Sequence, residues 1–378
     1  MIYLDNAATT LRKPPAVARA MGEALRRGGG AGRGGHEAAM WAADTLFACR
    51  QEAAALFGVD NPERVTFTAN ATHALGIAIG SAARTPGRVL VSGYEHNAVM
   101  RPLEALKEKG FTVEILSAPL FEPEITLHRF EEALGDGGGV SFVVCTHVSN
   151  VFGFILPAER IARLCHAAGV AFVLDAAQSA GCLPIDAAAL PGVYIAMPGH
   201  KGLYGPQGTG LLISPANALP EPLLRGGTGS RSADAAMPDF LPDRLEAGTH
   251  NLPGVAGLLE GLRYLRRRGV DSVLRHERAL TESLLRTLSR RPRLRVYHAD
   301  HLFCQTGVLA FTVEGMDAEC IAEQLAQKGV AVRAGLHCAP AAHRTAQTFP
   351  GGAVRVSFSA FNTPRDVDAF LRALEGLL

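Results

Sequence analysis

The chain has 378 residues, which at roughly 150 residues per domain is enough for two or three domains, or for one large and one small domain. Its 37 lysines and arginines nearly balance its 36 aspartates and glutamates, which argues against a nucleic-acid partner and favours a small-molecule one. With 48% hydrophobic and 19% charged residues, the composition excludes a disordered chain and a coiled coil.

Up to about residue 250, short apolar runs alternate with amphipathic stretches. A helical stretch at 17–27 leads into the glycine-rich patch 28–35, which we expect to be a flexible loop. The runs that follow are apolar on both faces, as strands of parallel sheets are. This alternation predicts an open α/β sheet with ligands at the carboxyl ends of its strands. The predicted strands are 88–92, 140–146, 170–174, 193–197 and 210–213, and the helices between them include 97–109 and 157–168.

Beyond about Asn251 the pattern changes to long helices mixed with strands, which predicts a smaller α+β domain. We therefore expect a large domain at 13–255 and a small domain at 256–378 that includes the N-terminal segment 1–12. In this second part the predicted helices are 254–268, 270–291, 318–328 and 364–378, and the predicted strands are 294–298, 308–313, 330–333 and 354–358.

Cysteine usage and hydropathy predict a cytoplasmic protein that does not enter a membrane. No apolar run reaches the ~18 residues of a membrane span, and the segment 1–5 lacks the charged-then-apolar pattern of a signal peptide. The seven cysteines are scattered and form no CxxC pair, which disfavours a disulfide framework or a zinc ribbon. We expect six of them to be packing residues and one to be reactive.

Two local patterns resemble ligand sites but lack the necessary context. Gly30-x-Gly32-x-x-Gly35 matches the dinucleotide fingerprint, yet a helical stretch and not a strand precedes it. Cys338 and His343 could be metal ligands, but no second ligand pair lies at a suitable spacing. We therefore expect neither a nucleotide nor a metal at these positions.

Two charged residues follow neighbouring predicted strands. Lys201 lies among glycines directly after the strand 193–197, where a Schiff-base lysine could meet a bulky ligand. Asp175 follows the strand 170–174, where a carboxylate could pair with a protonated pyridine nitrogen. Together they indicate a site for pyridoxal 5′-phosphate (PLP) at the carboxyl edge of the sheet.

Several short motifs follow one another along nearly the full chain: 3–9 (YLDNAAT), Glu95-His96, 146–150 (THVSN), 175–178 (DAAQ), Gly199-His200-Lys201, 246–251 (EAGTHN) and 333–339 (RAGLHCA). In this order they resemble the class V aminotransferase family of fold-type I PLP enzymes, and within it the cysteine desulfurases and selenocysteine lyases. The resemblance implies a large PLP-binding α/β domain with a mainly parallel central sheet, and a small α+β C-terminal domain.

The resemblance assigns the residues around the cofactor ring. It implies that Lys201 carries PLP as a Schiff base, that Asp175 holds the pyridinium nitrogen, and that Gln178 bonds the phenolic oxygen. His96 matches the histidine that stacks on the ring and takes part in catalysis. Asn150 matches the asparagine beside the ring oxygen and the substrate carboxylate.

For the cofactor phosphate, the resemblance points to Ala71 and Thr72 at the start of a helical pattern, where amides favour a dianion. His200 would add a donor from the lysine loop. Thr249 matches a threonine that reaches the phosphate of the neighbouring subunit, which implies a homodimer with shared sites. Pro198 replaces the serine that this family usually has in the lysine motif, so one phosphate hydroxyl is lost. His73 similarly replaces a common glutamate.

On the substrate side, the resemblance implies that Arg355 clamps the substrate carboxylate through its planar fork. His36 and Ala8 match further substrate-side positions. Cys338, 17 residues before Arg355, lies in a short loop like that of the group-II desulfurases. We expect it to accept sulfur from L-cysteine as a persulfide, leaving L-alanine, with His337 or another nearby cation lowering its thiol pKa.

Other functions remain open at this point. The same cofactor would serve a selenocysteine lyase, with L-selenocysteine as substrate, another C–S lyase, or a plain aminotransferase, and a cofactor-binding scaffold without turnover is a further alternative. A desulfurase of this group implies a small sulfur-acceptor protein as partner and a role in iron–sulfur cluster assembly. One chain identifies neither the acceptor nor the pathway.

Overall fold

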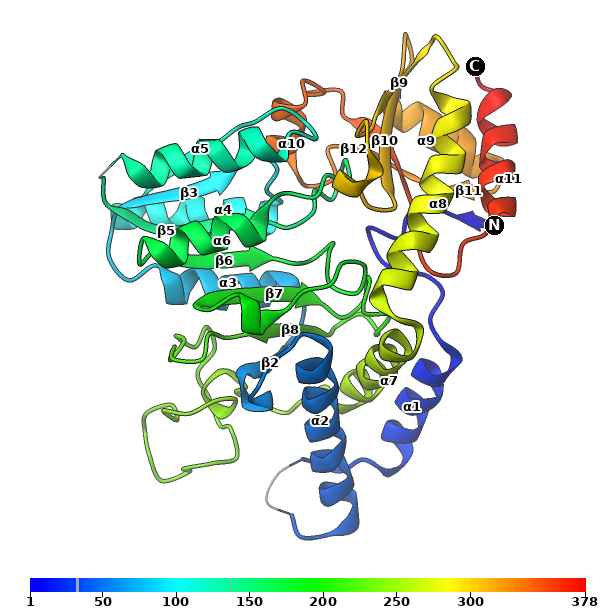
Figure 1. The fold of residues 1–378 in the computed structure, drawn as a ribbon. Coiled ribbons are helices and arrows are strands. Elements are labelled where there is room, and N and C mark those ends of the chain that lie inside the picture. The colour runs from blue at the N-terminus through cyan, green and yellow to red at the C-terminus, as the bar shows by residue number, and fades with distance from the viewer. Residues whose placement is uncertain (32–33, 137) are drawn as a thin grey trace.

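A seven-stranded sheet forms the centre of the larger part of the molecule (Figure 1). The computed structural model describes residues 1–31, 34–136 and 138–378. Neighbouring strands are parallel except for β8, which runs antiparallel to both of its neighbours. In spatial order the strands are β2 (Val65–Thr68), β8 (Gly210–Ile213), β7 (Val193–Pro198), β6 (Ala171–Asp175), β5 (Val140–Thr146), β3 (Arg88–Ser92) and β4 (Thr112–Leu116).

Helices cover both faces of this sheet, because alternate strand residues enter two separate cores. Val89 and Val91 of β3 pack into one core, and Leu90 packs into the other. α3 (Ala71–Ala82) and α4 (Asn97–Leu106) belong to the first core, whereas α5 (Pro123–Gly135) and α6 (Ala158–Ala167) belong to the second. At the β2 edge, α1 (Pro15–Arg27) and α2 (Glu37–Leu56) pack against α7 (Leu252–Arg268) (Figure 1).

The C-terminal part has its own sheet and its own core. Its four strands are antiparallel in the order β12 (Arg333–Gly335), β13 (Ala353–Ser357), β10 (Val308–Val313) and β9 (Leu294–Tyr297). The N-terminal strand β1 (Ile2–Tyr3) pairs in parallel with β11 (Val330–Ala331), so the first residues of the chain lie beside this part. The helices here are α8 (Val270–Leu288), α9 (Ala318–Gln327), α10 (Pro340–Thr345) and α11 (Pro364–Glu375).

The predicted α/β class is confirmed, and three details differ from the prediction. The strand 330–333 is two strands, because β11 pairs with β1 whereas β12 pairs with β13. Strand 210–213 is antiparallel although it is apolar on both faces, since helices cover both sides of a strand in either direction. The helix predicted at 270–291 ends at Leu288, and the last helix ends at Glu375.

Six α-helices and strands were missing from the sequence prediction: β1, α2, β2, β4, α5 and α10. The apolar residues of α2 are mainly alanines spread around the helix, so it lacks one clear apolar face. β4 is an edge strand with no fully buried residue, which weakens its pattern. The domain boundary expected between residues 255 and 256 falls inside the continuous helix α7, and the division at that point stays a prediction.

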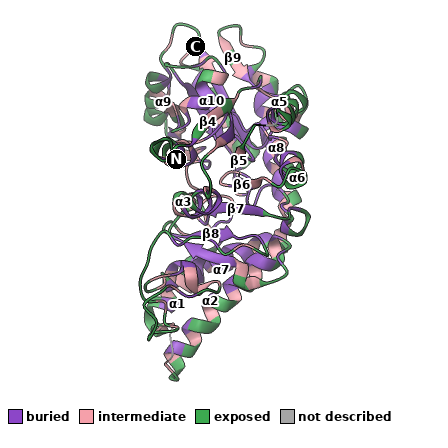
Figure 2. Ribbon diagram, turned by 90° about the vertical axis from the view of Figure 1, so that its left-hand side faces the viewer, coloured by how far each residue is buried: buried purple, intermediate pink, exposed green. Residues whose placement is uncertain are grey.

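Burial follows the sheets closely. Buried residues concentrate on the strands, and exposed residues lie along the outer sides of the helices (Figure 2).

Within the described part of the chain, every helix is too short or too polar to cross a lipid bilayer.

Candidate active site

A cavity of about 250 Å³ lies at the carboxyl ends of three neighbouring parallel strands. Thr146, Asp175 and Pro198, the last residues of β5, β6 and β7, all line it. This is the edge at which open α/β sheets bind ligands. Eleven of the predicted site residues meet there: Ala8, Ala71, Thr72, His96, Asn150, Asp175, Gln178, His200, Lys201, Cys338 and Arg355.

Two predicted residues lie elsewhere. Thr249 lines another cavity together with the rest of the motif 246–251, and His36 is an exposed residue at the N-cap of α2. Neither lines the cavity described above within this single chain. The predicted role of Thr249 requires a second subunit, and the roles of both residues stay predictions.

Lys201 and Asp175 form the charged centre of the cavity. Burial lowers the pKa of Lys201 to about 8, with Arg355 and Arg333 contributing and Asp175 opposing. Burial raises the pKa of Asp175, although a hydrogen bond from the Ala177 amide to its Oδ1 (2.8 Å) and the charge of Lys201 act against it. A lysine in this state has a substantial population of free amine near neutral pH, as a base or nucleophile requires.

The glycine after Lys201 has a packing reason. A Cβ on Gly202 would overlap the carbonyl oxygen of Ala180, so only glycine fits at this approach. The lysine loop is also held from the N-terminal segment, since Lys13 Nζ donates to the His200 carbonyl at 2.9 Å. The reactive amine is therefore carried on a well-supported turn.

His96 occupies the N-cap of α4 with its ring on the cavity wall. Its Nδ1 accepts a hydrogen bond from the Ala98 amide (3.0 Å), which leaves the proton of the neutral ring on Nε2. Burial, followed by the charge of Lys201, lowers the His96 pKa to about 4. The ring is neutral at physiological pH and can lie flat against an aromatic ligand.

The N-terminus of α3 supplies backbone donors to the cavity. Asn70 caps the helix by accepting from the His73 amide (2.9 Å), and Ala71 and Thr72 line the cavity at the first turn. Amides at this position attract anions. Nearby, Nδ1 of His200 is buried without a hydrogen-bond partner among the described residues, as expected of an atom that bonds a ligand.

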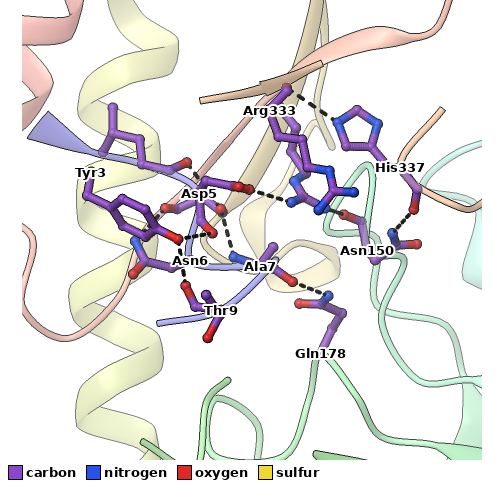
Figure 3. A network of polar contacts seen from close by, with 12 residues as sticks. Tyr3, Asp5, Asn6, Ala7, Thr9, Asn150, Gln178, Arg333 and His337 are labelled. Carbon is purple, nitrogen blue, oxygen red and sulfur yellow. Dashed lines mark hydrogen bonds and ion pairs between the residues drawn. The ribbon is translucent and has the colours of Figure 1, made fainter. Parts of the chain in front are cut away.

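The N-terminal segment and the C-terminal sheet meet in a polar network (Figure 3). Arg355, only 2% exposed, pairs through Nη2 with Asp5 Oδ1 (2.7 Å) and donates through Nη1 to the Asn150 carbonyl (2.8 Å). Its Nε has no partner in the described residues. Gln178 Nε2 donates to the Ala7 carbonyl at 2.9 Å, so residues of both parts of the chain surround one side of the cavity.

Two residues of this network were not among the predicted site residues. Asp5 neutralises Arg355, and Arg333 lies opposite Arg355 in the β12–β13 pairing and also lines the cavity. Both residues lie within motifs that carried the family resemblance, so those motifs could have pointed to them. Their pairing with Arg355 could not be inferred, because it depends on contacts between distant segments.

Cys338 is an exposed residue on the cavity wall, in the turn between β12 and α10. Cys338 is therefore not a buried structural cysteine. His337 does not act as the predicted cation, because burial, Arg355 and His343 lower its pKa to about 2 and keep it neutral. Of the six cysteines predicted to be packing residues, five are buried and Cys320 is exposed, which corrects that prediction.

No group of three potential metal ligands occurs among the residues that the structure describes. The charged residues that line the cavity include Lys201, Asp175 and Arg355. This arrangement of a half-buried amine, a buried carboxylate and an anion-binding helix end fits PLP, the cofactor that the motifs predicted.

The family model of aminotransferase class-V matches residues 2–370. The chain belongs to this family. It is 32% identical to a probable cysteine desulfurase from Methanothermobacter thermautotrophicus, covering 99% of this chain and 94% of that protein. A probable cysteine desulfurase from Mycolicibacterium paratuberculosis is 33% identical over 99% of this chain, which spans only 55% of that longer relative.

Solved structures agree with this assignment. An apo cysteine desulfurase from Thermococcus onnurineus NA1 superposes with a TM-score of 0.90 at 30% identity, covering 100% of this chain and 94% of that chain. The cysteine desulfurase CsdA from Escherichia coli follows with a TM-score of 0.87 at 28% identity, covering 99% of this chain and 94% of that chain. The predicted family and fold type are confirmed, and the enzymes of this family depend on PLP.

Proposed function

We propose that the protein is a PLP-dependent cysteine desulfurase that converts L-cysteine to L-alanine and retains the sulfur as a persulfide on Cys338. One observation carries the proposal: the exposed residue Cys338 and the half-buried Lys201 lie on the walls of the same cavity. An amine that can take a proton and a thiol that can take sulfur are the two groups that this reaction needs from the protein.

The cavity fits the cofactor on several counts. Lys201 is its covalent anchor, Asp175 the partner of its ring nitrogen, and neutral His96 the residue that stacks on its ring. Gln178 uses one amide hydrogen on Ala7 and retains a second for the ring oxygen. The amides of the α3 N-terminus and the unpaired Nδ1 of His200 would meet the phosphate.

Bound PLP supplies an electron sink for the pair released at the substrate Cα. Arg355 orients the substrate by pairing with its carboxylate, and Asn150 adjoins Arg355 through its carbonyl. Lys201 takes the Cα proton through Nζ, which is favoured by a pKa of about 8.

The sulfur step is balanced without an outside oxidant. The Cys338 thiolate attacks the substrate sulfur, the new S–S bond forms, and the Cβ–S bond of the substrate breaks with its electron pair passing to Cβ. Cβ then takes a proton and Lys201 returns a proton to Cα, so the organic product is alanine and the sulfur atom stays on Cys338. A reductant or an acceptor protein must remove that sulfur before the next turnover.

The test compares wild type with Cys338→Ala, using Cys320→Ala as a control for loss of the other exposed cysteine. We expect Cys338→Ala to keep the absorbance change on addition of cysteine and to lose alanine formation by about 10²-fold or more, as for other catalytic groups. Mass measurement should find one added sulfur on the wild-type Cys338 peptide. Undiminished alanine formation by Cys338→Ala would eliminate the persulfide step. If Cys338→Ala instead loses cysteine turnover but retains selenocysteine turnover, the result would favour a selenocysteine lyase.

Further parts of the proposal concern assembly and location. We infer a homodimer in which Thr249 and His36 complete the partner's site and Ala8 contacts the substrate, since Thr249 and His36 lie outside the cavity of their own chain. A small sulfur-acceptor protein would receive the persulfide for iron–sulfur cluster assembly. The seven free cysteines fit a reducing, cytoplasmic location.

A further inference from the structure

The turn that carries Cys338 has an unusual backbone conformation. His337 and Cys338 both have positive φ angles, 50° and 55°, and neither is a glycine. This region of φ is unfavourable for residues that have a Cβ, and the conformation persists only where the surroundings hold it in place. The contacts that hold this turn should therefore be visible around it.

Backbone contacts account for part of the support. The Cys338 carbonyl accepts from the Asn97 amide at the start of α4 (2.8 Å), and the His337 carbonyl accepts from Asn150 Nδ2 (2.9 Å). The Asn150 contact is visible in Figure 3. These bonds fix the two carbonyl groups, but they do not fix the His337 side chain.

A chain of buried side chains lies beneath the turn. His337 Nδ1 faces His343 Nε2 at 3.4 Å, and His343 Nδ1 faces Thr348 Oγ1 at 2.7 Å. The two ring planes are nearly parallel, at 12°. His343 is fully buried, and His337 and Thr348 are 5% and 8% exposed.

The far end of this chain fixes the direction of its hydrogen bonds. His337 Nε2 faces the Arg333 carbonyl at 3.4 Å, and a carbonyl only accepts, so Nε2 carries the proton. Nδ1 of the neutral ring must then accept from His343 Nε2, and His343 Nδ1 must accept from the Thr348 hydroxyl. Burial keeps both rings neutral, since it lowers the pKa of His337 to about 2 and that of His343 to about 4.

We propose that Thr348 and His343 are positioning residues for sulfur transfer: their hydrogen bonds fix the tautomer and orientation of His337, and thereby hold Cys338 in the left-handed turn that presents its thiol to the cavity. This inference rests on the proposed function. Neither residue lines the cavity, and both act through the residue next to the nucleophile.

The test separates the sulfur step from the steps before it, in the PLP-loaded enzyme. Thr348→Val removes the hydroxyl with little change in shape, His343→Phe keeps a flat ring against Phe152 (5.8 Å between ring centroids), and Thr348→Ser restores the donor. Thr112→Val, on the exposed edge strand β4, is the matched control. Three rates are measured: the absorbance change on addition of cysteine, persulfide formation on Cys338 in a single turnover, and alkylation of Cys338 by iodoacetamide.

We expect Thr348→Val and His343→Phe to slow persulfide formation by about 3- to 10-fold, because each variant loses one buried hydrogen bond. Thr348→Ser keeps the hydroxyl donor and should retain most of the wild-type rate. The absorbance change and the alkylation rate should stay within about twofold of wild type, since the thiol remains present and accessible. An unchanged rate of persulfide formation in both variants would overturn the proposal. A fall in the alkylation rate equal to the fall in persulfide formation would also overturn it, because it would indicate an altered thiol and not an altered position. If wild-type enzyme forms no persulfide, the proposed function itself fails.

Discussion

Replacing Asp5 with asparagine removes the negative charge that faces Arg355 while keeping the side chain's shape. The backbone at this position has independent support, because the Ser357 amide donates to the Leu4 carbonyl at 2.7 Å and Asp5 itself bridges to Ser357. The substitution therefore tests the ion pair and leaves the local chain path in place.

The expected loss of stability follows from the burial of Arg355. Removing one partner of a fully buried pair costs about 3–5 kcal/mol, and a hydrogen bond to a charged group is worth about 1.5–3 kcal/mol. Asp5 has 19% of its side-chain surface exposed, and asparagine can still accept from Nη2 through its amide oxygen. We therefore expect the free energy of unfolding to fall by about 2 kcal/mol, within the range for a hydrogen bond to a charged group.

Thermal unfolding measures this effect, with Asp60→Asn as the control. Asp60 pairs with Arg64 at 2.6 Å but its own side chain is 78% exposed, so this substitution should leave the unfolding midpoint nearly unchanged. Asp5→Asn should lower the midpoint by a few degrees. Equal midpoints for Asp5→Asn, Asp60→Asn and wild type would refute the reasoning about the buried pair.

Two further predictions concern titration. Apoprotein should take up PLP faster as the pH rises through about 8, because the free amine of Lys201 is the nucleophile. In Asp5→Asn the midpoint of this pH dependence should shift to lower pH, since Asp5 raises the Lys201 pKa. A pH-independent rate of uptake would contradict this. Burial raises the pKa of Glu95 to about 8, above its ordinary value of 4.5, so its contribution to stability is complete below pH 4.5 and is lost as the pH rises through 8. Glu95→Gln should therefore make the thermal midpoint less dependent on pH between 5 and 9, and an unaltered pH dependence would show that Glu95 does not titrate in this range.

The strands of the large sheet were predictable because their information is local. Each is a short run that is apolar on both faces, and burial on both sides of a sheet requires that pattern whatever the rest of the chain does. Lys201 and Asp175 could be placed for the same reason, since each is adjacent to the end of such a run. The antiparallel direction of β8 was missed, although the connection 199–209 from β7 is short for a parallel crossover.

The sequence alone predicted which residues would meet and at which edge of the sheet, because strand ends and motifs are properties of neighbouring residues. Only the tertiary structure decided the states of those residues. Asp5 reaches Arg355 across 350 positions, and the neutrality of His337 depends on burial and on charges that surrounding segments bring to it. The free energy of a buried charge is set by every group packed around it, and those groups become neighbours only when the chain folds.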